Sequence, residues 1–212
     1  MLPAAQRESR LTSCDSEEWK QHTQEGYAIV HGRIDPSAAG IVLQHHQRFD
    51  GSGFAGLPAV EGKPTETVHR ALSGGAIHVY ARIVMAADVF CQTLFAGARL
   101  PQPMVKTLWQ IQQVPLRQAF DPVVHAGLMK IFAPFVEGMV VMLSDGRQAV
   151  VTETSSGCYP AVRVVGDMGE EAGRERTVKL AEREDLWIHA VDGVEVEKYL
   201  YGVRKTPSAA AA

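Results

Sequence analysis

The sequence is poor in cysteine, in net charge and in long hydrophobic runs. Its 212 residues include three scattered cysteines and no CxxC pair, which excludes a disulfide framework and a zinc knuckle. The net charge of −3 gives no electrostatic field that would attract DNA or RNA. No apolar run reaches the roughly 18 residues of a transmembrane helix, and the N-terminus lacks the basic and apolar regions of a signal peptide. We therefore expect a cytoplasmic protein with reduced thiols and without membrane or nucleic-acid partners.

Helix signals dominate the chain up to about residue 136. Hydrophobic residues make up 46% of the sequence, which is enough to build a buried core. Asp35-Pro36 has the form of an N-cap followed by proline at the first helical position, and Asp121-Pro122 repeats this form. Apolar residues recur at helical spacing over 77–95, which predicts a buried helix there. The first part of the chain is therefore predicted to be α-helical.

The pattern changes to short β-branched runs after Gly138. Such runs occupy 139–143, 149–152, 161–165, 178–180 and 186–191, and turn residues such as Asp145-Gly146 separate them. Five short strands in about 55 residues predict a small SH3-like β-barrel. The chain as a whole is thus expected to be mainly α, with a helical domain at 11–136, a barrel at 138–192 and a tail at 193–212 whose end is disordered.

The stretch from His45 to Phe54 is the strongest functional signal. It reads His-His-Gln-Arg-Phe-Asp-Gly-Ser-Gly-Phe, with two adjacent histidines followed by an aspartate and a Gly-x-Gly turn. Adjacent imidazoles near a helix end point about 100° apart, so they serve two neighbouring metal ions more easily than one. The glycines let the backbone turn sharply and approach a ligand closely. This arrangement favours a metal site beside a ligand-binding turn.

Four short segments together resemble the HD-GYP family. His45–Phe54 is similar to the family's HHExxDGxGYP signature. Trp19–His22, followed by Gly26, is similar to the family's helix that carries a single ligand histidine. Arg82–Asp88 is similar to its RIxxxAD segment, and Phe120–Pro122 is similar to the start of its last helix. The resemblance covers about residues 11–136. Two positions differ, since Gln47 stands where the family has glutamate and Phe54-Ala55 where it has Tyr-Pro.

The resemblance implies an HD-type helical domain that hydrolyses cyclic di-GMP with divalent metal ions. Iron or manganese is the expected metal, bound in a di- or trinuclear site. The implied metal ligands are His22, His45, His46 and Asp88, and the implied substrate-binding residues are Asp50, Gly51, Gly53 and Phe54. The expected partner is a cyclic dinucleotide, and the barrel is a candidate surface for a protein partner.

Residues 1–212 contain no His-Asp dipeptide, although family members carry this pair before the position equivalent to Leu11. Half of the expected metal shell is therefore missing. We expect weak or no turnover from a truncated or degenerate phosphohydrolase. The alternative is a non-enzymatic signalling module that binds a nucleotide or a protein.

Simpler roles remain open for several of these residues. Asp88 could instead form a salt bridge with Arg82 or Arg99. His22 could be an ordinary surface histidine, and Asp50 could accept a hydrogen bond within its own turn. The remaining histidines match no ligand position and are predicted to be structural or surface residues: His31, His69, His78, His125 and His189.

Overall fold

The computed structural model describes residues 17–54, 71–96, 98–155, 157–165 and 177–202. The chain divides into two compact units that are discontinuous in sequence. The first unit combines the chain up to Arg99 with Gln113–Ala126. The second combines Leu100–Gln112 with the chain from Gly127 onward. Residues 203–212, which include the predicted disordered end of the tail, lie outside the described part.

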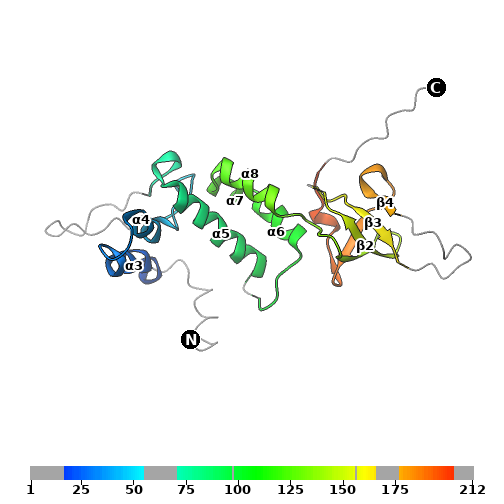
Figure 1. Cartoon of the computed structure of the whole chain (residues 1–212), viewed down its shortest axis with the longest axis horizontal. Helices are drawn as coiled ribbons and strands as arrows, with labels where there is room; N and C mark the ends of the chain where they lie inside the picture. The colour runs from blue at the N-terminus through cyan, green and yellow to red at the C-terminus, as the bar shows by residue number, and fades with distance from the viewer. Residues whose placement is uncertain (1–16, 55–70, 97, 156, 166–176, 203–212) are drawn as a thin grey trace, which may run out of the picture. The chain divides into compact units, whose positions relative to one another are not determined.

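The first unit consists of helices. They are α2 (Glu17–Lys20), α3 (His22–Val30), α4 (Pro36–Gln44), the 3-10 turn η1 (Gly74–Ala76), α5 (Val79–Phe95), α7 (Leu116–Ala119) and the start of α8 (Pro122–Ile131). Helices α3 and α4 lie side by side, and α4 also packs against α5 (Figure 1). The site described below lies where α3 begins and α4 ends.

Both predicted Asp-Pro helix starts are confirmed. Asp35 Oδ1 accepts hydrogen bonds from the backbone N–H groups of Ser37 and Ala38, and Pro36 is the first residue of α4. Asp121 Oδ1 accepts from the backbone N–H of Val123 in the same way at the start of α8. Each aspartate satisfies N–H groups that a helix start otherwise leaves without a partner.

Helix α5 confirms the predicted helix at 77–95 but is buried on one side only. Ala81, Met85, Ala86 and Phe90 form its buried face. Ile83 and Val84, which belong to the apolar pattern that predicted burial, are 46% and 40% exposed. The apolar residues of α5 surround the helix, so the sequence pattern does not distinguish its two sides.

The second unit contains an antiparallel sheet and helix α6 (Met104–Ile111). The strands are β1 (Val140–Leu143), β2 (Gln148–Glu153), β3 (Ala161–Val164), β4 (Thr177–Lys179), β5 (Ile188–Val191) and β6 (Val194–Glu195). Their order in the sheet is β4-β3-β2-β1-β5-β6, and every neighbouring pair is antiparallel. Each of the five predicted β-branched runs overlaps a strand. The short β6 was not predicted from the sequence.

Helix α6 contributes to the core around the strands. Val105 of α6 and Phe135 lie in one buried core with strand residues such as Val141 and Ile188. The predicted domains at 11–136 and 138–192 are continuous in sequence, whereas the two compact units are not, and the domain bounds stay a prediction. Among the described residues the strand order runs from β4 to β6 without a pairing between these two ends, so closure into a barrel stays a prediction.

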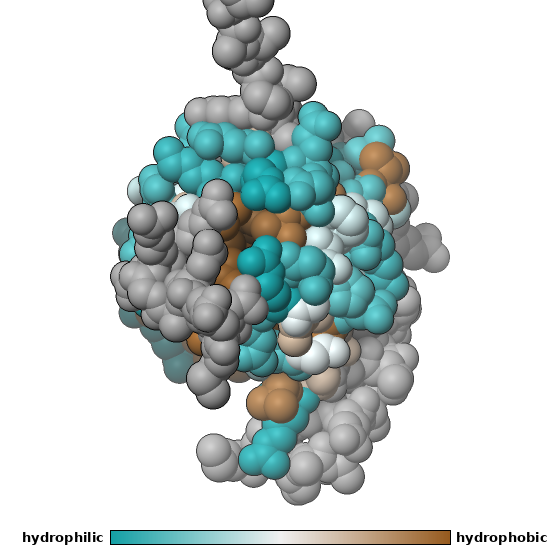
Figure 2. All heavy atoms as spheres, turned by 90° about the vertical axis from the view of Figure 1, so that its right-hand side faces the viewer, coloured by the Kyte–Doolittle hydropathy of each residue, from teal (hydrophilic) through white to brown (hydrophobic). Residues whose placement is uncertain are grey.

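The described surface in this view is mainly hydrophilic, with hydrophobic side chains showing at several separate places (Figure 2). Within the described ranges, no helix combines the length and apolar character needed to cross a membrane.

Candidate functional site: a cluster of three histidines

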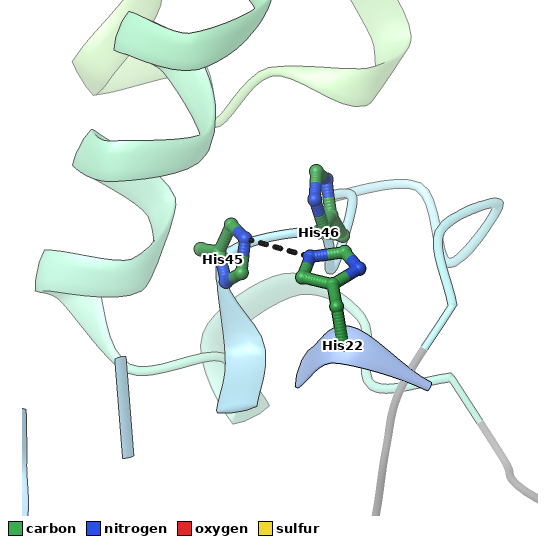
Figure 3. A group of neighbouring side chains, drawn as sticks. All are labelled: His22, His45 and His46. Atoms are coloured by element: carbon green, nitrogen blue, oxygen red, sulfur yellow. Dashed lines mark hydrogen bonds between the residues drawn. The ribbon is translucent and has the colours of Figure 1, made fainter. Parts of the chain in front are cut away.

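Three imidazoles from two helices converge in the first unit. His22 is the first residue of α3, His45 follows the last residue of α4, and His46 comes next. One nitrogen from each ring lies within 4.8 Å of a nitrogen from each of the others. Figure 3 shows the three rings facing a common space, with His22 and His45 directed toward one another. We call these three residues the histidine cluster.

Backbone hydrogen bonds fix the protonation of two of these rings. Nδ1 of His22 lies 2.5 Å from the carbonyl oxygen of Trp19, and Nδ1 of His45 lies 2.8 Å from that of Val42. A carbonyl oxygen only accepts, so each Nδ1 must carry the hydrogen. In the neutral rings Nε2 is then an acceptor with a free lone pair. The helix ends therefore present two metal-binding nitrogens in the correct tautomer.

The two Nε2 atoms lie 3.3 Å apart, as the dashed line in Figure 3 marks. Two lone pairs repel at this distance unless a proton or a cation lies between them. Two nitrogens bound at about 2.0–2.1 Å to one tetrahedral ion such as zinc are roughly 3.3–3.4 Å apart. Burial lowers the pKa of His45 below its ordinary value, with a further lowering by His22, so a bound proton is disfavoured on His45. The donor set therefore fits a metal ion.

His46 is the third donor and faces the carboxylate of Asp88. Burial, followed by the neighbouring His45 and His22, lowers the pKa of His46 to about 3. The ring is therefore neutral at physiological pH, and its 4.0 Å approach from Nδ1 to Asp88 Oδ2 is not an ion pair there. A neutral imidazole with a carboxylate close by is the form that binds divalent metals.

Asp88 lies on α5 at the edge of the histidine cluster. Its neighbours in the sequence are apolar and suggest a buried position, but Asp88 is partly exposed. Its side chain is 36% exposed, and Oδ2 accepts a hydrogen bond of 2.7 Å from Nε2 of Gln92. Arg82, one of the two alternative salt-bridge partners, instead pairs with Asp121. Although burial raises the pKa of Asp121, hydrogen bonds from Val123 and Arg82 outweigh this effect and hold that pKa below its usual value. Asp88 thus remains free of Arg82 and close to His46.

Two aromatic rings contact the histidine cluster. Phe54 was predicted from the sequence to bind substrate, whereas Trp19 was not among the predicted site residues. His46 stacks on Phe54 with ring centres 4.9 Å apart, and the ring of Trp19 lies 4.8 Å from that of His46. Trp19 also contacts His22 at 4.7 Å and Phe54 at 5.4 Å. Phe54 was predicted to offer a stacking face to a nucleotide base. One of its faces is occupied by His46, so that face is not available to a base.

The turn after the histidines is held by contacts within the chain. Asp50 Oδ1 accepts hydrogen bonds from the backbone N–H and the hydroxyl of Ser52, so it acts as a turn aspartate on the surface. Gly51 has a φ of +82°, a conformation that favours glycine. A Cβ on Gly53 would meet the carbonyl oxygen of His46 and would lie 2.5 Å from the backbone N of Arg48. These residues shape the turn in this structure, and their role in binding substrate stays a prediction.

Gln47 connects the histidine pair to a distant segment. Its side chain is 1% exposed, and Oε1 accepts a hydrogen bond of 2.8 Å from the backbone N–H of Leu72. Two further bonds join the same regions, from Gly74 N–H to the carbonyl of Phe49 and from His78 N–H to Oε1 of Gln44. Nε2 of Gln47 is buried without a hydrogen-bond partner among the described residues. Gln47 therefore ties down the chain that returns toward α5.

The other described histidines lie outside the cluster. His31 stacks near Tyr27, His78 accepts from the backbone N–H of Tyr80 at the start of α5, and His125 is buried against Phe120. His189 lies 3.5 Å from Glu197 in the second unit. His69 lies outside the described residues.

Comparison with known proteins gives one informative match. The chain is 36% identical over 90 residues to the cyclic di-GMP phosphodiesterase response regulator RpfG of Xanthomonas campestris pv. campestris (strain 8004). The match covers 41% of this chain and 20% of that protein, so it spans about one fifth of the relative's length. No protein-family model and no solved structure matched the chain. The similarity supports a relation to cyclic di-GMP phosphodiesterases.

Proposed function

We propose that the chain is a metal-binding module of the cyclic di-GMP phosphodiesterase type, with weak or no turnover of its own. The observation that carries this proposal is the pair of Nε2 atoms on His22 and His45. Both rings are committed at Nδ1 to backbone carbonyls, and their free nitrogens face each other at 3.3 Å. A divalent cation would accept both lone pairs at once, and imidazole nitrogen is a suitable ligand for such ions.

The cluster with Asp88 provides three imidazole nitrogens and one carboxylate. Imidazole suits iron, zinc and related ions, and carboxylate also suits manganese, so iron and manganese remain the proposed metals. A bound ion would lower the pKa of a coordinated water and neutralise charge on a phosphoryl group. His46 contributes a ring that stays neutral, and Asp88 contributes the negative charge. Among the described residues this is the one group of three such side chains within binding distance.

A single ion explains why weak turnover is proposed. Hydrolysis by a two-metal site needs one ion to activate the attacking water and a second to stabilise the leaving oxygen. The histidine cluster offers donors for one ion, and Gln47 is neutral where the family has a glutamate. These features favour the non-enzymatic alternative, in which the module binds a cyclic dinucleotide as a signal without cleaving it. Trp19 and Phe54 beside the cluster offer aromatic surface to such a ligand.

The metal site is tested by calorimetric titration of the purified chain with Fe²⁺ under anaerobic conditions, and with Mn²⁺ and Zn²⁺. We expect one ion per chain in the wild type and at least a tenfold weaker affinity in H22A, H45A and H46A. The matched control is H31A, which removes an exposed imidazole outside the cluster and should bind like the wild type. Equal affinity in all four variants would refute the metal site.

The two functional candidates are separated by measuring binding and hydrolysis of cyclic di-GMP side by side on the metal-loaded chain. Binding without release of a linear product supports the signalling module. Turnover that disappears in H45A but not in H31A supports the enzyme. If the metal-loaded chain neither binds nor cleaves cyclic di-GMP, the proposed ligand is wrong even where the metal site is right.

A further inference from the structure

Trp19 contacts the histidine cluster through both its ring and its backbone. Its ring lies 4.7 Å from the ring of His22 and 4.8 Å from the ring of His46, centre to centre. Its carbonyl oxygen accepts the hydrogen bond from Nδ1 of His22 at 2.5 Å. A single residue thus contacts two of the three imidazoles by its ring and fixes one of them by its backbone.

The ring of Trp19 also closes a small aromatic group. Phe54 stacks on His46 with an interplanar angle of 26°, and Trp19 meets the edge of Phe54 at 5.4 Å. The His46 ring therefore packs against both Trp19 and Phe54 while its Nδ1 lies toward Asp88. Packing of this kind restricts rotation about the side-chain bonds of a ligand, which lowers the entropy lost when a metal binds.

We propose that Trp19 is a positioning residue for metal binding, which holds His22 and His46 in the geometry that the ion requires. This inference rests on the metal site proposed above. Trp19 has no metal-binding atom directed at the cluster by any observed contact, so it acts through the two imidazoles. Residues that orient ligands from outside the coordination shell typically change metal affinity by about 10–100-fold when they are replaced.

Two substitutions separate the ring from the backbone. The carbonyl of residue 19 is present in every variant, so the hydrogen bond to Nδ1 of His22 is retained. Trp19→Ala removes the ring that packs on His22 and His46, and we expect metal affinity about tenfold or more weaker. Trp19→Phe keeps an aromatic ring at the same place, and we expect it to recover most of the wild-type affinity.

A second substitution tests whether a loss of overall stability alone weakens metal binding. Phe90→Leu opens space in the buried face of α5, in the same unit, and lowers the free energy of unfolding without removing a ring from the cluster. Circular dichroism and urea unfolding would establish that each variant is folded under the titration conditions. We expect Phe90→Leu to bind metal like the wild type, whereas Trp19→Ala binds weakly even though it is folded.

The outcomes distinguish this inference from the proposed function. If the wild type binds metal and Trp19→Ala binds equally well, the positioning role is refuted and the metal site stands. If Trp19→Phe is as weak as Trp19→Ala, the aromatic ring is not what positions the imidazoles, which also refutes the proposal. If the wild type binds no metal, the proposed function fails and the positioning role fails with it. Weak binding by both Trp19→Ala and Phe90→Leu would assign the effect to stability and refute the inference.

Discussion

Gly53 is the position where one added carbon should disturb the histidine cluster most. An ideal Cβ there would meet the carbonyl oxygen of His46, and it would lie 2.5 Å from the backbone N of Arg48 and 3.0 Å from the backbone C of Gln47. All three are backbone atoms, so no flexible side chain can move aside. Relief requires the turn to move away from His46, or His46 to move with it.

The expected cost of Gly53→Ala follows from this crowding. Forcing an extra carbon into a closely packed place typically costs about 1–3 kcal/mol. Gly53 has no positive φ, so the backbone conformation itself adds no further penalty for alanine. Because the displaced atoms belong to residues 46–48, we expect metal affinity to fall together with the free energy of unfolding. Calorimetric titration measures the fall in metal affinity, and urea unfolding measures the fall in the free energy of unfolding.

Gly40→Ala is the matched control for this substitution. Gly40 lies in the middle of α4, and a Cβ there would meet no atom within 4 Å. Alanine stabilises a helix interior by roughly 0.5–1 kcal/mol relative to glycine, so this variant should be slightly more stable and should bind metal normally. A Gly53→Ala chain with wild-type stability and wild-type metal affinity would show that the turn does not hold His46 as described.

Three further outcomes are expected. Gln47→Leu keeps the side-chain volume but leaves the backbone N–H of Leu72 without its acceptor, so urea unfolding should show a loss of about 1–3 kcal/mol; an unchanged midpoint would contradict this role. His46 stays neutral in the folded chain down to about pH 3, whereas the unfolded chain takes up a proton near pH 6.5. The free energy of unfolding of the metal-free chain should therefore decrease as the pH falls from 6.5 toward 3, and His46→Phe should reduce this decrease. Asp35→Ala removes the cap of α4 and should cost about 1 kcal/mol without a direct effect on the imidazole nitrogens, as thermal unfolding and metal titration would show.

Local features of the fold could be predicted because they depend on neighbouring residues. The Asp35 and Asp121 caps follow from the residue types that satisfy the free N–H groups of a helix start. The strands at 140–143 and 188–191 follow from short β-branched runs between turns. The adjacency of His45 and His46 is given by the sequence itself. Predictions of this kind need no knowledge of the contacts between distant segments.

Contacts between distant segments could not be predicted in the same way. The hydrogen bond from Leu72 to Gln47 joins residues 25 positions apart, and no local pattern indicates it. Val105 joins the core of the sheet although α6 lies among helices in the sequence. Trp19 was named only as the start of the segment Trp19–His22, and its contacts with His46 depend on how α2 lies against the end of α4. Each of these contacts is decided by tertiary packing rather than by spacing along the chain.

The electrostatics of the histidine cluster indicates why a metal is a better occupant than a proton. A proton shared by His22 and His45 would place a positive charge in a partly buried space beside a third imidazole, and burial already lowers the pKa values of His45 and His46. A divalent ion would also bring positive charge, but the three imidazoles could each offer it a nitrogen lone pair, and the carboxylate of Asp88 lies close to His46. The same burial that makes protonation unfavourable keeps the lone pairs available to a metal at neutral pH. The packing that lowers the pKa values of His45 and His46 is thus also what keeps their lone pairs available in the proposed metal site.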